Sequence, residues 1–110
     1  MFRKKEVVLQ RNKNQQSSIT VKAKLIENGD LRIDGHDLTH QDKNMFGAKE
    51  YEWALIVSSD NIPQLQKELG SQADILKSLK LHFSDDNSAK LKSFLEEHQI
   101  QFKFWNRVGD

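Results

Sequence analysis

Four segments of the chain alternate between apolar and polar residues, which is the period of a β-strand with one buried face. In the first segment Ile, Val, Ala and Leu occupy every second position from Ile19 to Leu25. A short polar stretch around Gly29 joins the first two segments, so we predict a hairpin there. The four segments are residues 19–25, 31–34, 51–58 and 100–107.

The register of this hairpin follows from the length of its turn. A two-residue turn would place Leu25 opposite Arg32 and would mix apolar and charged side chains on one face. A three-residue loop of residues 27–29 instead pairs Leu25 with Leu31 and keeps the apolar side chains together, so we predict the longer loop. Gly29 then takes a left-handed backbone conformation, in which a residue with a Cβ atom would be strained.

A helical period appears between the last two of these segments. Polar residues that suit helix N-termini precede the apolar runs, and Gly70 suits the end of the first helix. The order of elements is β-β-β-α-α-α-β, which predicts an α+β fold with helices packed on one face of an antiparallel sheet. The predicted helices are residues 61–69, 75–83 and 88–99.

The length of 110 residues suits one domain. Residues 10–18 are wholly polar and follow neither period, so we predict a single domain over residues 1–110 with a polar, mobile arm at residues 1–17. Within that arm, residues 5–9 also suit a short edge strand. The chain has no cysteine and no apolar run near the roughly 20 residues that cross a bilayer, so we expect a cytoplasmic protein without membrane contact.

Charge is unevenly distributed, although the net charge is only +1. Residues 1–26 contain seven Lys or Arg and one Glu, whereas residues 27–60 contain three Lys or Arg and eight Asp or Glu. Two interpretations remain open. Either the basic and acidic residues pair across neighbouring strands, or the acidic segment forms a face that binds a basic partner.

His36 and His40 lie four positions apart in a stretch rich in aspartate. They follow a strand and a glycine, so we place them in a connecting loop rather than on a helix that could hold zinc. A zinc site needs at least three protein ligands, and nothing in the sequence fixes a third. The sequence also lacks a phosphate-binding glycine loop, a nucleophile elbow and a Cys/His pair. We therefore predict no enzyme activity, no cofactor and no metal.

The two tryptophans are predicted to have different environments. Trp53 is in phase with Leu55 and Val57, so we predict that it belongs to the core. Trp105 points away from Phe104, and an exposed Trp among charged residues suits an interface. The candidate partner-binding residues are Asp34, Asp37, Asp42, Glu50, Glu52, Trp105 and Arg107.

A family resemblance is carried by three segments, "LIENGDLRIDGHDL", "FGAKEYEWALIVSSDNIPQL" and "IQFKFWNRVGD". Together they resemble the immunity proteins of contact-dependent growth inhibition and related polymorphic toxin systems, over residues 24–110. The resemblance implies a non-enzymatic inhibitor that binds the toxic domain of a delivered effector, often a nuclease, and blocks its active site in the cytoplasm. We expect this inhibitor to be a monomer.

The alternative function is a nucleic-acid-associated regulatory domain that uses the basic N-terminal arm. Against it, the isoelectric point of about 8.0 is below the value typical of nucleic-acid-binding domains, and the acidic segment would repel phosphates. A metal-dependent enzyme built on His36 and His40 is a third interpretation. The basic residues of the arm are Arg3, Lys4, Lys5, Arg11 and Lys13.

Overall fold

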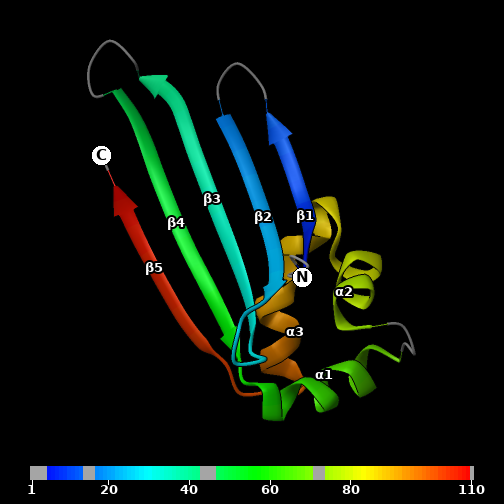
Figure 1. Ribbon diagram of the computed structural model, residues 1–110. Coiled ribbons are helices and arrows are strands. Elements are labelled where there is room, and N and C mark those ends of the chain that lie inside the picture. The colour runs from blue at the N-terminus through cyan, green and yellow to red at the C-terminus, as the bar shows by residue number, and fades with distance from the viewer. Residues whose placement is uncertain (1–4, 14–16, 43–46, 71–73, 110) are drawn as a thin grey trace.

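The structure is a computed structural model that describes residues 5–13, 17–42, 47–70 and 74–109 (Figure 1). An antiparallel sheet forms one layer and the helices pack on one face of it, which is the α+β class predicted from the sequence. The elements in these residues are β1 (Glu6–Lys13), β2 (Ser17–Leu25), β3 (Leu31–Asp42), β4 (Gly47–Val57), α1 (Ile62–Leu69), α2 (Ile75–Phe83), α3 (Leu91–Glu97) and β5 (Lys103–Gly109), with 3₁₀ helices at Ser59–Asn61 (η1) and Asp85–Lys90 (η2).

The strands lie in the sheet in their chain order, and each is antiparallel to the next. The hairpin between β2 and β3 has the predicted register, with Leu25 opposite Leu31. Its loop also has the predicted conformation, because the φ angle of Gly29 is 89°. The helices follow β4 in the chain, so β5 returns from the helical layer to pair beside β4.

The predicted mobile arm is in part a strand. Residues 6–13 form β1 and pair with β2, so the arm assignment for this part of residues 1–17 is wrong. The rest of the arm, except Lys5 and Ser17, lies outside the described residues. The predicted element order left this strand out, although the expectation that residues 5–9 suit an edge strand is confirmed for residues 6–9, which lie in β1 at the edge beside β2.

A β-bulge explains why β1 does not show a two-residue period. The register with β2 shifts between Val8 and Gln10, and Leu9 and Gln10 are consequently both buried. The hydroxyl of Ser88 in η2 donates a hydrogen bond to the Gln10 side-chain oxygen at 2.6 Å. Because this amide is satisfied inside the protein, β1 can bury a polar residue at a modest cost.

The prediction that His36 and His40 lie in a loop is wrong, because β3 extends to Asp42. β3 pairs with β4 along this extension as far as the pair of Asp42 with Gly47. Residues four apart on a strand share a face but lie about 13 Å apart. The two histidines therefore lack the close spacing that the same interval gives on a helix. The side chains of His40 and Asp42 lie outside the described residues.

Local sequence signals fix the ends of the helices. Gly70 ends α1 with a φ angle of 67°, as predicted. The Asp74 carboxylate accepts a hydrogen bond from the backbone N–H of Lys77 at the start of α2. α3 is shorter than the predicted helix because residues 85–90 form η2. In the part of the chain that the structure describes, no helix is long and apolar enough to cross a membrane.

The hydrophobic core lies between the helices and one face of the sheet. Ile33 of β3 and Leu55 of β4 are fully buried, as are Leu79 of α2 and Leu95 of α3. The helices cover mainly the end of the sheet near β1 and β2, whereas β5 and the far ends of the central strands extend past them (Figure 1). The helical layer therefore leaves part of the inner face open.

Trp53 lies at the border of this core and is half-buried, so the prediction that it is a core residue is only partly right. Its indole ring lies over Gly35, the residue opposite it on β3. A Cβ atom at position 35 would lie 2.0 Å from Cε2 of the ring. Glycine is therefore required at this strand position for Trp53 to lie flat against the sheet.

We predict that Gly35→Ala lowers the free energy of unfolding by about 1–3 kcal/mol, because the added methyl group pushes the Trp53 ring off the sheet. Urea denaturation of Gly35→Ala measures this cost. In a Trp53→Val background the ring is absent, so the same Gly35→Ala change should cost little. An equal cost in both backgrounds would show that the ring does not constrain position 35.

Candidate protein-binding surface

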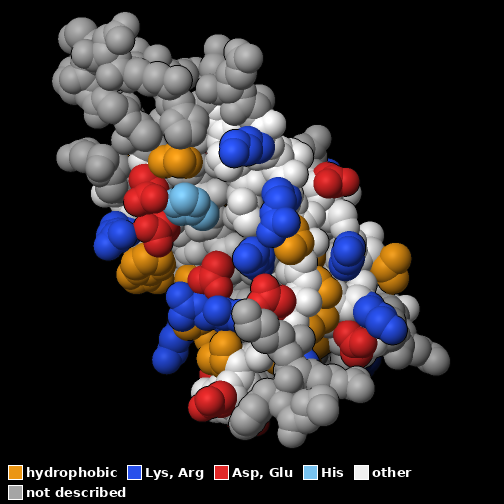
Figure 2. Space-filling model, turned by 45° about the horizontal axis from the view of Figure 1, so that its top comes forward, with side chains coloured by type: hydrophobic (Ala, Val, Ile, Leu, Met, Phe, Trp, Pro, Cys, Tyr) orange, Lys and Arg blue, Asp and Glu red, His pale blue; other side chains and the backbone are white. Residues whose placement is uncertain are grey.

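Among the described residues, no helix packs on the second face of the sheet, which we call the open face. It consists of the residues that alternate with the core positions, such as Asp34, His36 and Glu52 on the central strands. Figure 2 shows basic and acidic side chains interleaved on this side of the molecule. The charged members are Glu6, Arg11, Lys13, Lys22, Lys24, Arg32, Asp34, Glu50, Glu52, Lys103 and Arg107.

Ion pairs within a strand and across neighbouring strands hold the carboxylates of this face. Asp34 lies 2.9 Å from the Arg32 guanidinium and 3.8 Å from the Lys24 ammonium. On β4 and β5, Arg107 donates to Glu52 at 2.9 Å. Of the two interpretations of the charge pattern, the first is supported in part, since Lys24 of the basic segment pairs with Asp34 of the acidic segment across β2 and β3. Each pair is partly exposed, so its contribution to stability is small, about 0–1 kcal/mol.

A further pair lies in the middle of the open face. Nε2 of His36 lies 2.7 Å from a Glu50 carboxylate oxygen. One potential metal-binding atom from each of His36, Glu50 and Glu52 lies within 4.8 Å of the others. Arg107 already occupies one Glu52 oxygen and His36 occupies one Glu50 oxygen, so each carboxylate has a protein partner. We keep the prediction that this group binds no metal.

Five of the seven predicted partner-binding residues come together on the open face. Asp37 does not join them, because it is an inner-face residue that lies beside Tyr51 of β4. Asp42 belongs to β3, but its side chain lies outside the described residues. The five that share the open face are Asp34, Glu50, Glu52, Trp105 and Arg107.

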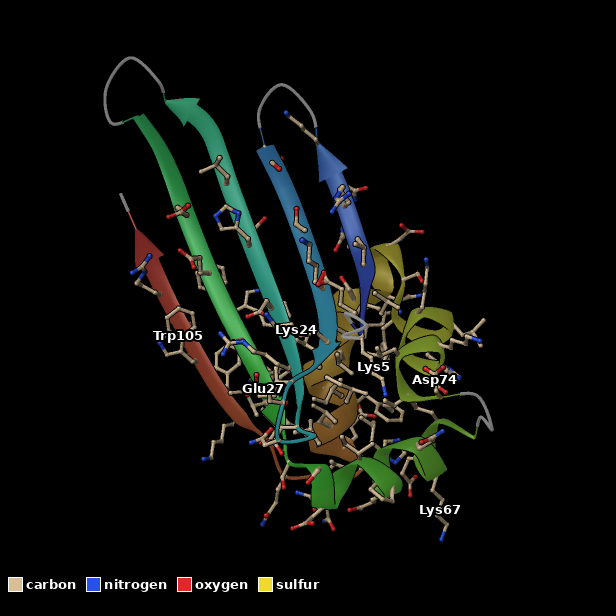
Figure 3. The ribbon with its side chains drawn as sticks, viewed as in Figure 1. Lys5, Lys24, Glu27, Lys67, Asp74 and Trp105 are labelled. Atoms are coloured by element: carbon tan, nitrogen blue, oxygen red, sulfur yellow. The ribbon has the colours of Figure 1, made fainter. Side chains whose placement is uncertain are left out.

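The exposed apolar side chains gather on β5. Trp105 projects from the open face with 48% of its surface exposed, so its predicted orientation is confirmed (Figure 3). Phe104 and Val108, on the inner side of the same strand, are 41% and 74% exposed. Among the described residues, the only other large apolar side chain that is exposed to this degree is Leu81 of α2, at 75%.

Sequence reasoning missed a groove on the inner face, where the sheet extends past the helices. It has a volume of about 400 Å³, and its lining includes three aromatic side chains, those of Tyr51, Trp53 and Phe104. The rings of Trp53 and Phe104 stack at 6.4 Å, and the Lys92 ammonium lies 5.0 Å from the Phe104 ring centre. Gly35 was the available signal, because a glycine within a strand often marks the close approach of another group.

Comparisons of the chain with protein-family models, with curated proteins and with solved structures found no match. The functional argument therefore rests on the surface itself. An exposed tryptophan, an adjacent arginine and a rim of paired charges are the usual composition of a protein-binding surface.

We predict that the two tryptophans differ in their contribution to folding. Trp53→Ala should lower the free energy of unfolding by about 2–3 kcal/mol, less than for a fully buried Trp because the ring is partly exposed. Trp105→Ala should cost less than about 1 kcal/mol, because the ring is about half exposed on the open face. Urea midpoints of both variants measure the difference. Equal losses would show that Trp105 is also packed as a core residue.

Proposed function

We propose that this protein is an immunity-type inhibitor, which binds a cognate toxin domain in the cytoplasm and blocks its active site without catalysing a reaction. The observation that carries the proposal is Trp105, a half-exposed ring on a sheet face that no helix covers. The resemblance of residues 24–110 to immunity proteins agrees with a binding function, and the arrangement of the open face supports it independently.

A strand-borne tryptophan suits a binding site for energetic reasons. Its ring offers a large contact area, and the paired backbone of β4 and β5 holds it in place before a partner arrives. Binding therefore immobilises few additional rotors, which lowers the entropic cost of association. Ala54, which faces Trp105 across the strands, is 2% exposed, so the ring also lies beside a tightly packed position.

The paired charges around Trp105 bear on the kind of toxin. Arg107 balances the charge of Glu52, so the open face exerts a weaker long-range attraction than an unpaired acidic patch would. The Glu50 carboxylate lies 2.7 Å from Nε2 of His36. At short range, basic side chains of a nuclease cleft can replace His36 and Arg107 as partners of the two carboxylates. A nuclease therefore remains the toxin class that we propose, with short-range pairing rather than long-range steering.

The nucleic-acid alternative also has an observation in its favour. Arg11 and Lys13 lie on the open face of β1, next to the β2 strand that carries Lys22 and Lys24. These residues form a basic stripe on the far side of the face from Trp105. An RNA ligand would use this stripe, so the two functions call on different residues and can be separated by mutation.

We predict that the chain forms a complex with the toxic domain encoded beside it and that Trp105→Ala weakens the complex at least about tenfold, a typical loss for a central tryptophan. Calorimetric titration with a catalytically inactive toxin domain measures the affinity. Leu81→Ala is the control, because Leu81 is also an exposed large apolar residue but lies on α2, away from the open face.

A double variant, Glu50→Gln with Glu52→Gln, tests the contribution of the carboxylates. It should also weaken binding, while Asp37→Asn on the other face should not. Failure to bind the neighbouring toxin, together with RNA binding that Lys22→Ala and Lys24→Ala abolish, would favour the alternative function instead.

A further inference from the structure

β5 is an edge strand with less protection than the strand at the opposite edge of the sheet. Within the part of the chain that the structure describes, its only strand neighbour is β4. Exposed edges pair readily with other strands, and proteins normally protect them with charges, bulges or covering segments. The opposite edge, β1, has such protection, because it contains a bulge and carries exposed Arg11 and Lys13. β5 also carries two exposed charges, Lys103 and Arg107, but its pairing with β4 shows no bulge. It exposes three large apolar side chains as well, those of Phe104, Trp105 and Val108.

We propose that β5 pairs with β5 of a second copy of this chain, in antiparallel orientation about a two-fold axis at Asn106. In this register Phe104 faces Val108 of the second copy on the inner side. On the open face, Trp105 faces Arg107 of the second copy. The two sheets join into one continuous sheet, and both open faces lie on the same side of it.

The strand is self-complementary in this register. The pair of Phe104 with Val108 covers two apolar side chains that are exposed in the single chain. The pair of Trp105 with Arg107 places a guanidinium beside an aromatic ring, which is favourable as a cation–π contact. Both pairs occur twice because of the symmetry.

Neighbouring registers that keep the open faces together bring like charges into opposition or leave apolar groups unpaired. An axis at Trp105 would oppose Lys103 to Arg107, and an axis at Arg107 would oppose the two Arg107 side chains. Like charges directly opposite each other destabilise a strand pair. The axis at Asn106 avoids both conflicts, because Lys103 then faces Gly109.

A second copy of this chain is favoured over a strand of another protein, because β5 matches its own sequence when the two strands are antiparallel. Pairing along seven residues buries a small area for a stable dimer, so we expect a reversible dimer that forms as concentration rises. This differs from the monomer expected from the sequence. The inference does not depend on a toxin, because assembly is measured on the chain alone.

Sedimentation equilibrium over low-micromolar to near-millimolar concentrations tests the proposal. The average mass should rise from 12.8 kDa toward twice that value. Val108→Lys should raise the dimer dissociation constant about tenfold or more, because it replaces an apolar contact with a charge at the dimer edge. Leu81→Lys, at an equally exposed apolar position on α2, should leave the constant unchanged.

A cross-link tests the position of the axis. The chain has no cysteine, so Asn106→Cys introduces a single thiol that meets its own copy at the axis. Opposed residues on antiparallel strands bring their Cβ atoms within about 4.5–5.5 Å, close enough for a disulfide after a small shift. Asn106→Cys should therefore form a covalent dimer under mild oxidation much faster than Leu81→Cys. A monomer at all concentrations, a dimer insensitive to Val108→Lys, or equal cross-linking rates would each overturn the proposal.

Discussion

The sheet of this protein buries only one of its faces, and its surface properties follow from that constraint. The helices come in one run between β4 and β5 and cover the inner face near β1 and β2. The open face must therefore be compatible with water, which it achieves in part by pairing opposite charges across strands. Trp105 is the exception on that face, because its large apolar ring stays half exposed. An exception of this kind is best explained by a partner that covers it.

The strands at the two edges of the sheet differ in how far the helical layer covers them. β1 is bulged, and its side chains reach into the helical layer through Leu9 and Gln10. β5 follows the helices, lies at the other edge and receives little cover from them. β5 contributes Trp105 to the open face and Phe104 to the groove on the inner face. Partner binding and self-association would therefore use the same strand.

The sequence predicted features that depend on local patterns. The register of the β2–β3 hairpin, the α+β class, the end of α1 at Gly70 and the facing of Trp105 all follow from the period of apolar residues or from the conformational freedom of glycine. These patterns involve residues close together in the sequence, so contacts with distant segments do not override them.

The missed features depend on contacts between segments far apart in the sequence. Gln10 can be buried because the Ser88 hydroxyl donates a hydrogen bond to its side-chain oxygen. The polar sequence of residues 10–18 did not indicate this partner. The polar end of β3 is a strand because β4 pairs with it, although His36 and its neighbours suggested a loop. Likewise, the acidic segment suggested an acidic face, but two of its carboxylates, Asp34 and Glu52, pair with basic residues on adjacent strands.

The central claim is that the open face, and not the inner face, is where a partner binds. The two tryptophans are reporters of this choice, because Trp105 lies on the open face and Trp53 on the inner face. The most direct measurement is a nuclear magnetic resonance titration with the proposed partner, the toxic domain encoded beside this protein. The titration follows the indole N–H signals of the two tryptophans. The account predicts that the Trp105 signal shifts or broadens and that the Trp53 signal stays in place. A shift of the Trp53 signal with an unchanged Trp105 signal would contradict it.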